Sequence, residues 1–124
     1  MPATADGVDV QLREIGYARA GDKGDTSNVV VAVFDDRDYE WLVRHLTVPI
    51  VAAHFGSLIR GSIVRYEMPG TKMLNFVMTK ALQGGVSRSL NLDAMGKSRA
   101  SLMLGLRIKC DPQDRPPSGR GYPS

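Results

Sequence analysis

The stretch Asn28-Val-Val-Val-Ala-Val-Phe34 is the most strongly strand-forming segment of the chain. Its valines are β-branched, and apolar side chains occupy both of its alternating faces, as in a strand that is covered on both sides. The stretch therefore predicts the central strand of a sheet. A Gly-rich segment precedes it at residues 21–25, and a helical pattern capped by Asp38 follows it.

Strand and helix patterns alternate on either side of this central strand. A strand is predicted from Val8 to Ala18, with a bulge near residues 14–16, where the alternation changes phase. Further strands are predicted at 62–67, 86–92 and 104–110, and helices at 38–46, 49–55, 71–82 and 94–103. The pattern predicts an α+β fold, a two-layer sandwich with helices on one face of a mainly antiparallel sheet of four or five strands.

Length and composition fit one folding unit. The 124 residues are 43% hydrophobic and 23% charged, the balance of an ordinary globular domain. We expect this unit to span residues 8–110, between a flexible N-terminus at 1–7 and a Pro- and Gly-rich flexible tail at 111–124. The sequence shows no membrane-spanning run, no secretory signal and a single cysteine, Cys110. These features predict a cytoplasmic protein without a disulfide, metal site or cofactor.

Charge is distributed unevenly along the chain. Residues 1–56 carry five basic side chains against nine carboxylates, and residues 57–110 carry nine against two, so their net charges are −4 and +7. A basic half could contact an acidic partner, a phosphate or nucleic acid. Two halves that interleave in the fold explain the asymmetry equally well. Nucleic acid is not expected, because the strands lack the aromatic and basic pattern of an RNA-binding sheet.

The densest polar cluster is Arg19-Ala-Gly-Asp-Lys-Gly-Asp-Thr-Ser-Asn28, between two predicted strands. Its glycines allow backbone conformations in which successive N–H groups point at one anion, and its basic side chains would add positive charge. Its carboxylates could instead pair with these bases, so that the cluster is a tight turn without a ligand. Both interpretations remain open. The residues concerned are Arg19, Gly21, Asp22, Lys23, Gly24, Asp25 and Asn28.

Other polar side chains lie downstream of this cluster. The segment Ser87-Arg88-Ser89 could offer hydroxyls and a guanidinium to a ligand oxygen, or could simply be a strand that follows a helix end. Asn75 lies within the predicted helix at 71–82, and its amide could tie that helix to the polar cluster. His45 and His54 fit no metal-binding spacing, so we expect them at the surface or at an interface.

The run Tyr17-Ala-Arg-Ala-Gly-Asp-Lys-Gly-Asp-Thr-Ser-Asn28 resembles a stretch in the C-terminal domain of the acyclic terpene utilisation protein AtuA family. The similarity continues in the same order and spans roughly residues 8–108. The further matching segments are Trp41-Leu42, His54-Phe-Gly56, Gly61, Arg65-Tyr-Glu67, Leu74-Asn-Phe-Val77, Gly84-Gly85, Ser87-Arg-Ser-Leu90, Asp93 and Gly96-Lys97. The resemblance implies a ferredoxin-like module, here as a stand-alone chain.

Members of this family are associated with the breakdown of acyclic terpenes and of branched or acyl-CoA-linked carbon sources. The resemblance therefore implies a small accessory subunit, whose partner is a large AtuA-like chain, further copies of itself, or both. Its polar loop would form an interface or an anion site for an acyl-CoA ligand. The ligand contacts would come from Arg19, Gly21, Lys23, Gly24, Asn28, Asn75, Ser87, Arg88 and Ser89.

Two alternatives belong to other classes of function. The chain could be an autonomous hydratase- or lyase-type enzyme that acts on CoA thioesters as a homo-oligomer. Asp22 or Asp25 would then be the general acid or base, and Lys23 or Ser87 would stabilise developing charge. The chain could also be a structural oligomerisation domain without a ligand. The sequence leaves the reaction and its catalytic residues unknown.

Overall fold

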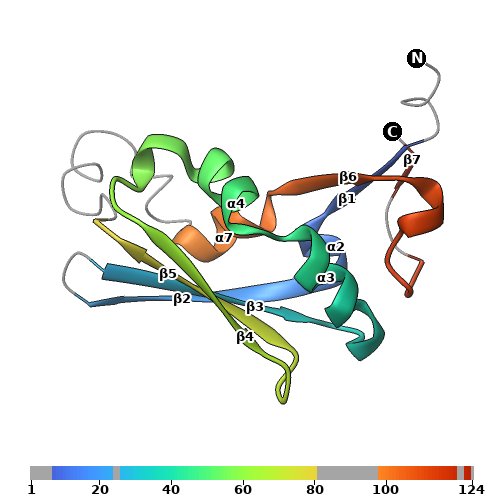
Figure 1. Ribbon diagram of the computed structural model, residues 1–124, viewed down its shortest axis with the longest axis horizontal. Coiled ribbons are helices and arrows are strands. Elements are labelled where there is room, and N and C mark those ends of the chain that lie inside the picture. The colour runs from blue at the N-terminus through green and yellow to red at the C-terminus, as the bar shows by residue number, and fades with distance from the viewer. Residues whose placement is uncertain (1–6, 24–25, 81–97, 120–121, 124) are drawn as a thin grey trace.

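Four antiparallel strands form the larger sheet, in the order β2-β3-β5-β4 (Figure 1). The strands are β2 (Gly16–Lys23), β3 (Thr26–Val33), β4 (Ile63–Met68) and β5 (Met73–Thr79). This computed structural model describes residues 7–23, 26–80, 98–119 and 122–123. The predicted central strand is confirmed, because β3 lies between β2 and β5 and pairs with both.

A smaller sheet and a layer of helices complete the fold. In the smaller sheet β1 (Val8–Gln11) pairs antiparallel with β6 (Arg107–Cys110) and with β7 (Tyr122–Pro123). The helices lie on one side of the larger sheet, as Figure 1 shows, so the two-layer α+β fold is confirmed. They are α2 (Leu12–Ile15), α3 (Tyr39–His45), α4 (Val48–Phe55) and α7 (Ser98–Leu104), with 3-10 turns η1 (Asp36–Asp38), η2 (Gly56–Leu58) and η3 (Pro112–Asp114).

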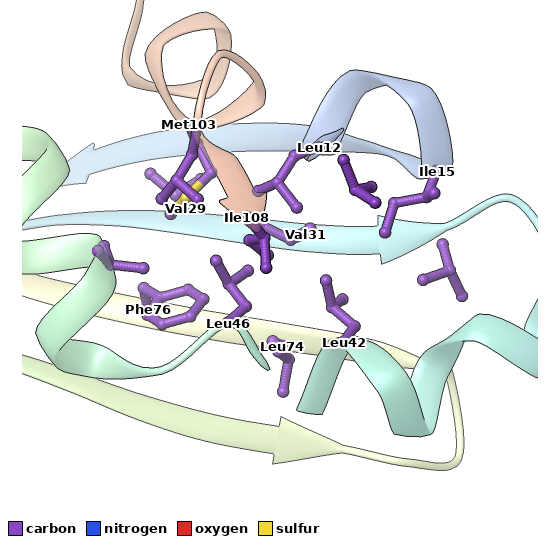
Figure 2. Packing of buried hydrophobic residues seen from close by; sticks show 14 of the residues in the cluster. Leu12, Ile15, Val29, Val31, Leu42, Leu46, Leu74, Phe76, Met103 and Ile108 are labelled. Atoms are coloured by element: carbon purple, nitrogen blue, oxygen red, sulfur yellow. The ribbon is translucent and has the colours of Figure 1, made fainter. Parts of the chain in front are cut away.

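A hydrophobic core fills the space between the larger sheet and the helices (Figure 2). The two central strands contribute alternate residues, because successive side chains of a strand point to opposite faces. Those on the core side are Val29, Val31, Val33, Leu74, Phe76 and Met78, and the helices add Leu12, Ile15, Tyr39, Trp41, Leu42, Val51, Phe55 and Met103. Burying each of these aliphatic or aromatic side chains stabilises the fold by about 1.5–3 kcal/mol. The sheet therefore gains its main packing energy from one face.

The helix predicted at 71–82 is wrong, because residues 73–79 form β5. Several apolar residues of this segment fit a helical stripe, but Leu74, Phe76 and Met78 fit an alternating strand equally well and are fully buried. Strand pairing with β3 on one side and β4 on the other decides between the two patterns. Such long-range pairing overrides the local preference of the sequence.

The strand predicted from Val8 to Ala18 is interrupted by α2, a single helical turn. A side chain caps the start of this turn: Glu14 Oε1 accepts a hydrogen bond from the backbone N–H of Gln11 at 3.2 Å. The phase change in the sequence therefore marks the point where the chain passes from the smaller to the larger sheet. The strand predicted at 86–92 lies outside the described residues.

Residues 111–119, expected to belong to a flexible tail, contact α3 and the turn before it. Trp41 Nε1 donates to the Asp114 carbonyl at 2.5 Å, and the Ser118 N–H donates to Asp38 Oδ1 at 2.9 Å. The Asp38 side chain thus binds this segment and does not cap α3, as its position before the helix had suggested. Composition could not reveal these contacts, because two of the groups involved belong to the tail's main chain.

Gly16 begins β2 at a point where two strands approach closely. A Cβ at this position would lie 2.2 Å from the carbonyl oxygen of Ala32, so the backbone would have to shift. We expect Gly16→Ala to lower the free energy of unfolding in urea by about 1–3 kcal/mol. Gly70→Ala is the control, because a Cβ there would meet nothing within 4 Å. Equal unfolding free energies for the two variants would contradict this register.

Asp114 binds the tail segment to α3 through its carboxylate, which lies 2.9 Å from Arg44 Nη1 and 2.8 Å from His45 Nε2. The hydrogen bond from Arg44, and then that from His45, lowers the pKa of Asp114 below its ordinary 3.8. Because its pKa is lowered in the folded state, the ionised Asp114 carboxylate stabilises the fold at pH values above its ordinary pKa. This stabilisation is lost as the pH falls through the pKa of the folded state, where the carboxylate becomes protonated.

Below about pH 4 we therefore expect acid to weaken the attachment of this segment. The fluorescence of Trp41 reports it, since the indole donates to the Asp114 carbonyl. In the Asp114→Asn variant, which has no carboxylate to protonate at this position, the change in Trp41 fluorescence with falling pH should be smaller. Identical acid transitions in both proteins would show that this carboxylate does not hold the segment.

Candidate interaction surface

The face of the larger sheet that points away from the helices is uncovered by any described element (Figure 1). Directly paired residues of neighbouring strands point to the same side, so the registers assign alternate residues to it. We call this surface the outer face. The registers assign to it Tyr17, Arg19, Gly21 and Lys23 on β2, Thr26, Asn28, Val30 and Ala32 on β3, Val64, Tyr66 and Met68 on β4, and Met73, Asn75, Val77 and Thr79 on β5.

Large apolar side chains are exposed on the outer face. Tyr17, Val64, Tyr66 and Met68 are between 37% and 53% exposed. Phe34, which directly follows β3, is 57% exposed and contacts Tyr17 with a ring separation of 5.7 Å. The solvated face of an antiparallel sheet is ordinarily polar. Because large exposed apolar patches are typical of interaction sites, this face is the candidate interaction surface of the domain.

Charge on the outer face has one sign among the described residues. Arg19 is exposed there, at the register position opposite Val30, and no carboxylate is assigned to this face. Glu67 pairs with Leu74 and so lies on the core side of β4, where it contacts Arg65 at 3.1 Å. A complementary partner surface would be apolar, with a carboxylate opposite Arg19.

A polar contact joins the two central strands on this face. Asn28 Nδ2 donates to Asn75 Oδ1 at 3.1 Å, and both side chains are partly buried. The tie between Asn75 and the polar cluster is therefore confirmed, although Asn75 lies on a strand and not on the predicted helix. On the other side of β3, buried Ser27 donates from Oγ to the Gly21 carbonyl at 3.3 Å. The first bond ties β3 to β5 on the outer face, and the second ties β3 to β2 on the core side.

The predicted ligand contacts and catalytic candidates separate into three groups in the structure. Four of them lie on the outer face, namely Arg19, Gly21, Asn28 and Asn75. The backbones of Asp22 and Lys23 pair with Ser27 and Thr26 at the end of the hairpin, which assigns Asp22 to the core side and Lys23 to the outer face. Gly24, Asp25, Ser87, Arg88 and Ser89 lie outside the described residues. An anion site on this loop stays a prediction.

The histidines and the cysteine lie away from the outer face. His45 contacts Asp114, and His54 Nε2 lies 2.7 Å from the Leu102 carbonyl on the helical side. Burial, with a further contribution from Asp114, raises the pKa of the Cys110 thiol. A raised pKa keeps this thiol protonated at neutral pH, and a protonated thiol is a poor nucleophile.

Sequence reasoning missed the apolar residues of the outer face. In β4, exposed Val64, Tyr66 and Met68 alternate with residues of the core side, so an apolar series was visible in the sequence. Such a series becomes a surface only when the register with β5 is known and no other element covers it.

A family model described as the AtuA ferredoxin-like domain matches residues 10–109. The chain belongs to this family. The match includes every strand of the larger sheet, so the AtuA resemblance and the ferredoxin-like fold are confirmed. Searches of curated proteins and of solved structures found no match to this AtuA domain. Within its described residues, no helix is long and apolar enough to cross a bilayer.

The bond between Asn28 and Asn75 can be measured with a double-mutant cycle. We expect Asn28→Ala and Asn75→Ala to be coupled by about 0.5–1.5 kcal/mol in the free energy of unfolding, the net value of one hydrogen bond. Asn75→Ala combined with Ser57→Ala, on exposed η2, should be additive. A coupling of zero between the asparagines would show that the bond contributes nothing to stability.

Proposed function

We propose that this AtuA ferredoxin-like domain is a small accessory subunit in the breakdown of acyclic terpenes or branched acyl-CoA compounds. It docks through the outer face onto a larger AtuA-like chain. The observation that carries this proposal is the exposed apolar face of the sheet, on which Arg19 is exposed and to which no carboxylate is assigned among the described residues. Membership of the family supports the catabolic setting and the kind of partner.

The dimensions of the outer face suit a protein partner. Four strands about 4.8 Å apart, each with about seven residues that rise about 3.3 Å, form a plane of roughly 450 Å² before side-chain relief is counted. A standard protein interface covers about 800 Å² on each partner. The outer face can therefore supply slightly more than half of one such surface.

The placement of the aromatic residues supports docking across the whole sheet. Tyr17 is on β2 and Tyr66 is on β4, and these are the two edge strands of the sheet. Tyrosine and arginine are frequent among the residues that contribute most to binding. Tyr17 and Tyr66 would anchor opposite edges of the partner, and Arg19 would pair with a carboxylate. The hairpin turn with Lys23 would contact anionic groups at one end.

Co-purification of the partner tests this proposal. The tagged chain and its Tyr66→Glu variant are expressed in the native cell, and co-eluting proteins are quantified by mass spectrometry. Tyr66 is 53% exposed on an edge strand, so its replacement should leave the melting temperature nearly unchanged. We expect the wild-type chain to recover a large AtuA-like chain in equal amount, and the variant to recover at least about tenfold less.

Ile50→Glu is the matched control, because Ile50 is a 39% exposed apolar residue on α4, on the other side of the sheet. This variant should retain the partner. Equal recovery by the wild-type chain and Tyr66→Glu would show that docking uses another surface. Recovery of only further copies of the same chain would contradict the accessory role and favour a self-associating domain.

A further inference from the structure

A pocket of about 400 Å³ opens on the helical side of the domain, and neither the outer face nor the proposed docking uses it. It lies where α2 meets the ends of α4 and α7. Small-molecule sites commonly have volumes between about 300 and 1,000 Å³ and combine apolar walls with a few polar groups. The pocket is lined by Arg13, His54, Ser101, Leu102, Leu104 and Gly105.

Arg13 supplies a guanidinium that no described side chain neutralises. It is exposed on α2, and it forms no ion pair or hydrogen bond within the part of the chain that the structure describes. Its Nη2 would lie 3.8 Å from a Cβ built on Gly105, so the missing side chain of this glycine leaves space beside the guanidinium. The planar donors of arginine match a carboxylate in a bidentate pair.

Two of the carbonyl groups of this pocket, those of Leu102 and Gly105, already have donors, so they compete less for the Arg13 guanidinium. The Leu102 carbonyl accepts from the Gly105 N–H at 3.1 Å and from His54 Nε2 at 2.7 Å. The Gly105 carbonyl accepts from Gln11 Nε2 at 3.3 Å. The guanidinium therefore keeps donors for a ligand, although it lies at the C-terminal end of α7, where carbonyl groups favour cations.

His54 and the two leucines define the rest of the pocket. Because a carbonyl can only accept, His54 Nε2 carries the hydrogen in its bond to Leu102, which fixes this nitrogen as a donor. Leu102 and Leu104 are half-buried and provide apolar wall. A ligand that satisfies both kinds of surface has an anionic head at Arg13 and an aliphatic chain against the leucines.

We propose that this pocket binds a small carboxylic acid with a short aliphatic chain, whose carboxylate pairs with the Arg13 guanidinium. A carboxylate fits better than a phosphate. Arg13 is the pocket's one permanent cation among the described residues, whereas a dianionic phosphate would require more positive charge. The site is independent of the outer face, so it can be tested on the isolated chain.

Titration of the isotope-labelled full chain with hexanoate, followed by amide chemical shifts, tests this site. We expect saturable shifts at Arg13, Leu102, Leu104 and Gly105, with a dissociation constant on the order of 1 mM. Hexanol, which lacks the charge, and acetate, which lacks the chain, should bind at least about tenfold more weakly. Inorganic phosphate serves as the competing anion.

Two pocket variants and one control variant test whether hexanoate binds at Arg13. Arg13→Gln should abolish the hexanoate shifts, while Arg60→Gln, at an exposed arginine outside the pocket, should preserve them. Gly105→Leu fills the space beside the guanidinium without removing it, and it should also abolish the hexanoate shifts. This variant tests the site if Arg13→Gln fails to fold. Unchanged binding in the folded pocket variants would overturn the proposal. Phosphate binding as tight as that of hexanoate would overturn the assignment of a carboxylic acid.

Discussion

The pairing of β3 with β2 and β5 is the constraint on which the rest of the structure depends. It brings Val29, Val31 and Val33 to one side of the larger sheet, where the helices bury them. Because a strand alternates with a period of two, the same pairing turns the residues between these valines to the other side. The core and the outer face are thus two consequences of one register.

The sequence predicts the parts of the fold that depend on local patterns. The β-branched run at 28–34 identified the central strand, and the separate helical patterns at 38–46 and 49–55 identified α3 and α4. Residues 73–79 were assigned to the wrong element, since their apolar spacing fits two periods and only pairing with β3 and β4 selects one. The spacing of apolar residues therefore predicts a helix or a strand well where it fits only one of the two periodicities.

The candidate site was predicted in part for the same reason. Arg19, Asn28 and Asn75 were singled out by polarity and Gly21 by its backbone freedom, and the structure brings all four to one face. The apolar residues of that face carried no such signal, because Tyr66 on β4 is ordinary in a strand until its exposure is known. The contacts of Asp114 with α3 depend partly on main-chain atoms, which composition does not describe.

The charge asymmetry of the sequence is partly balanced within the fold. Asp9 of the acidic half pairs with Arg107 of the basic half at 3.1 Å, across β1 and β6. Arg19 and Arg13 have no such partner among the described residues, and they lie on the outer face and in the pocket. Protein docking and small-molecule binding would thus use opposite sides of one domain.

The most direct test of the account is hydroxyl-radical footprinting of the outer face, in the purified chain and in the native cell extract. We predict that Tyr17, Phe34, Tyr66 and Met68 are labelled readily in the purified chain and are protected in the extract. Ile50 on α4 should be labelled equally in both. Equal labelling of the outer face in both samples would contradict the claim that a partner covers it.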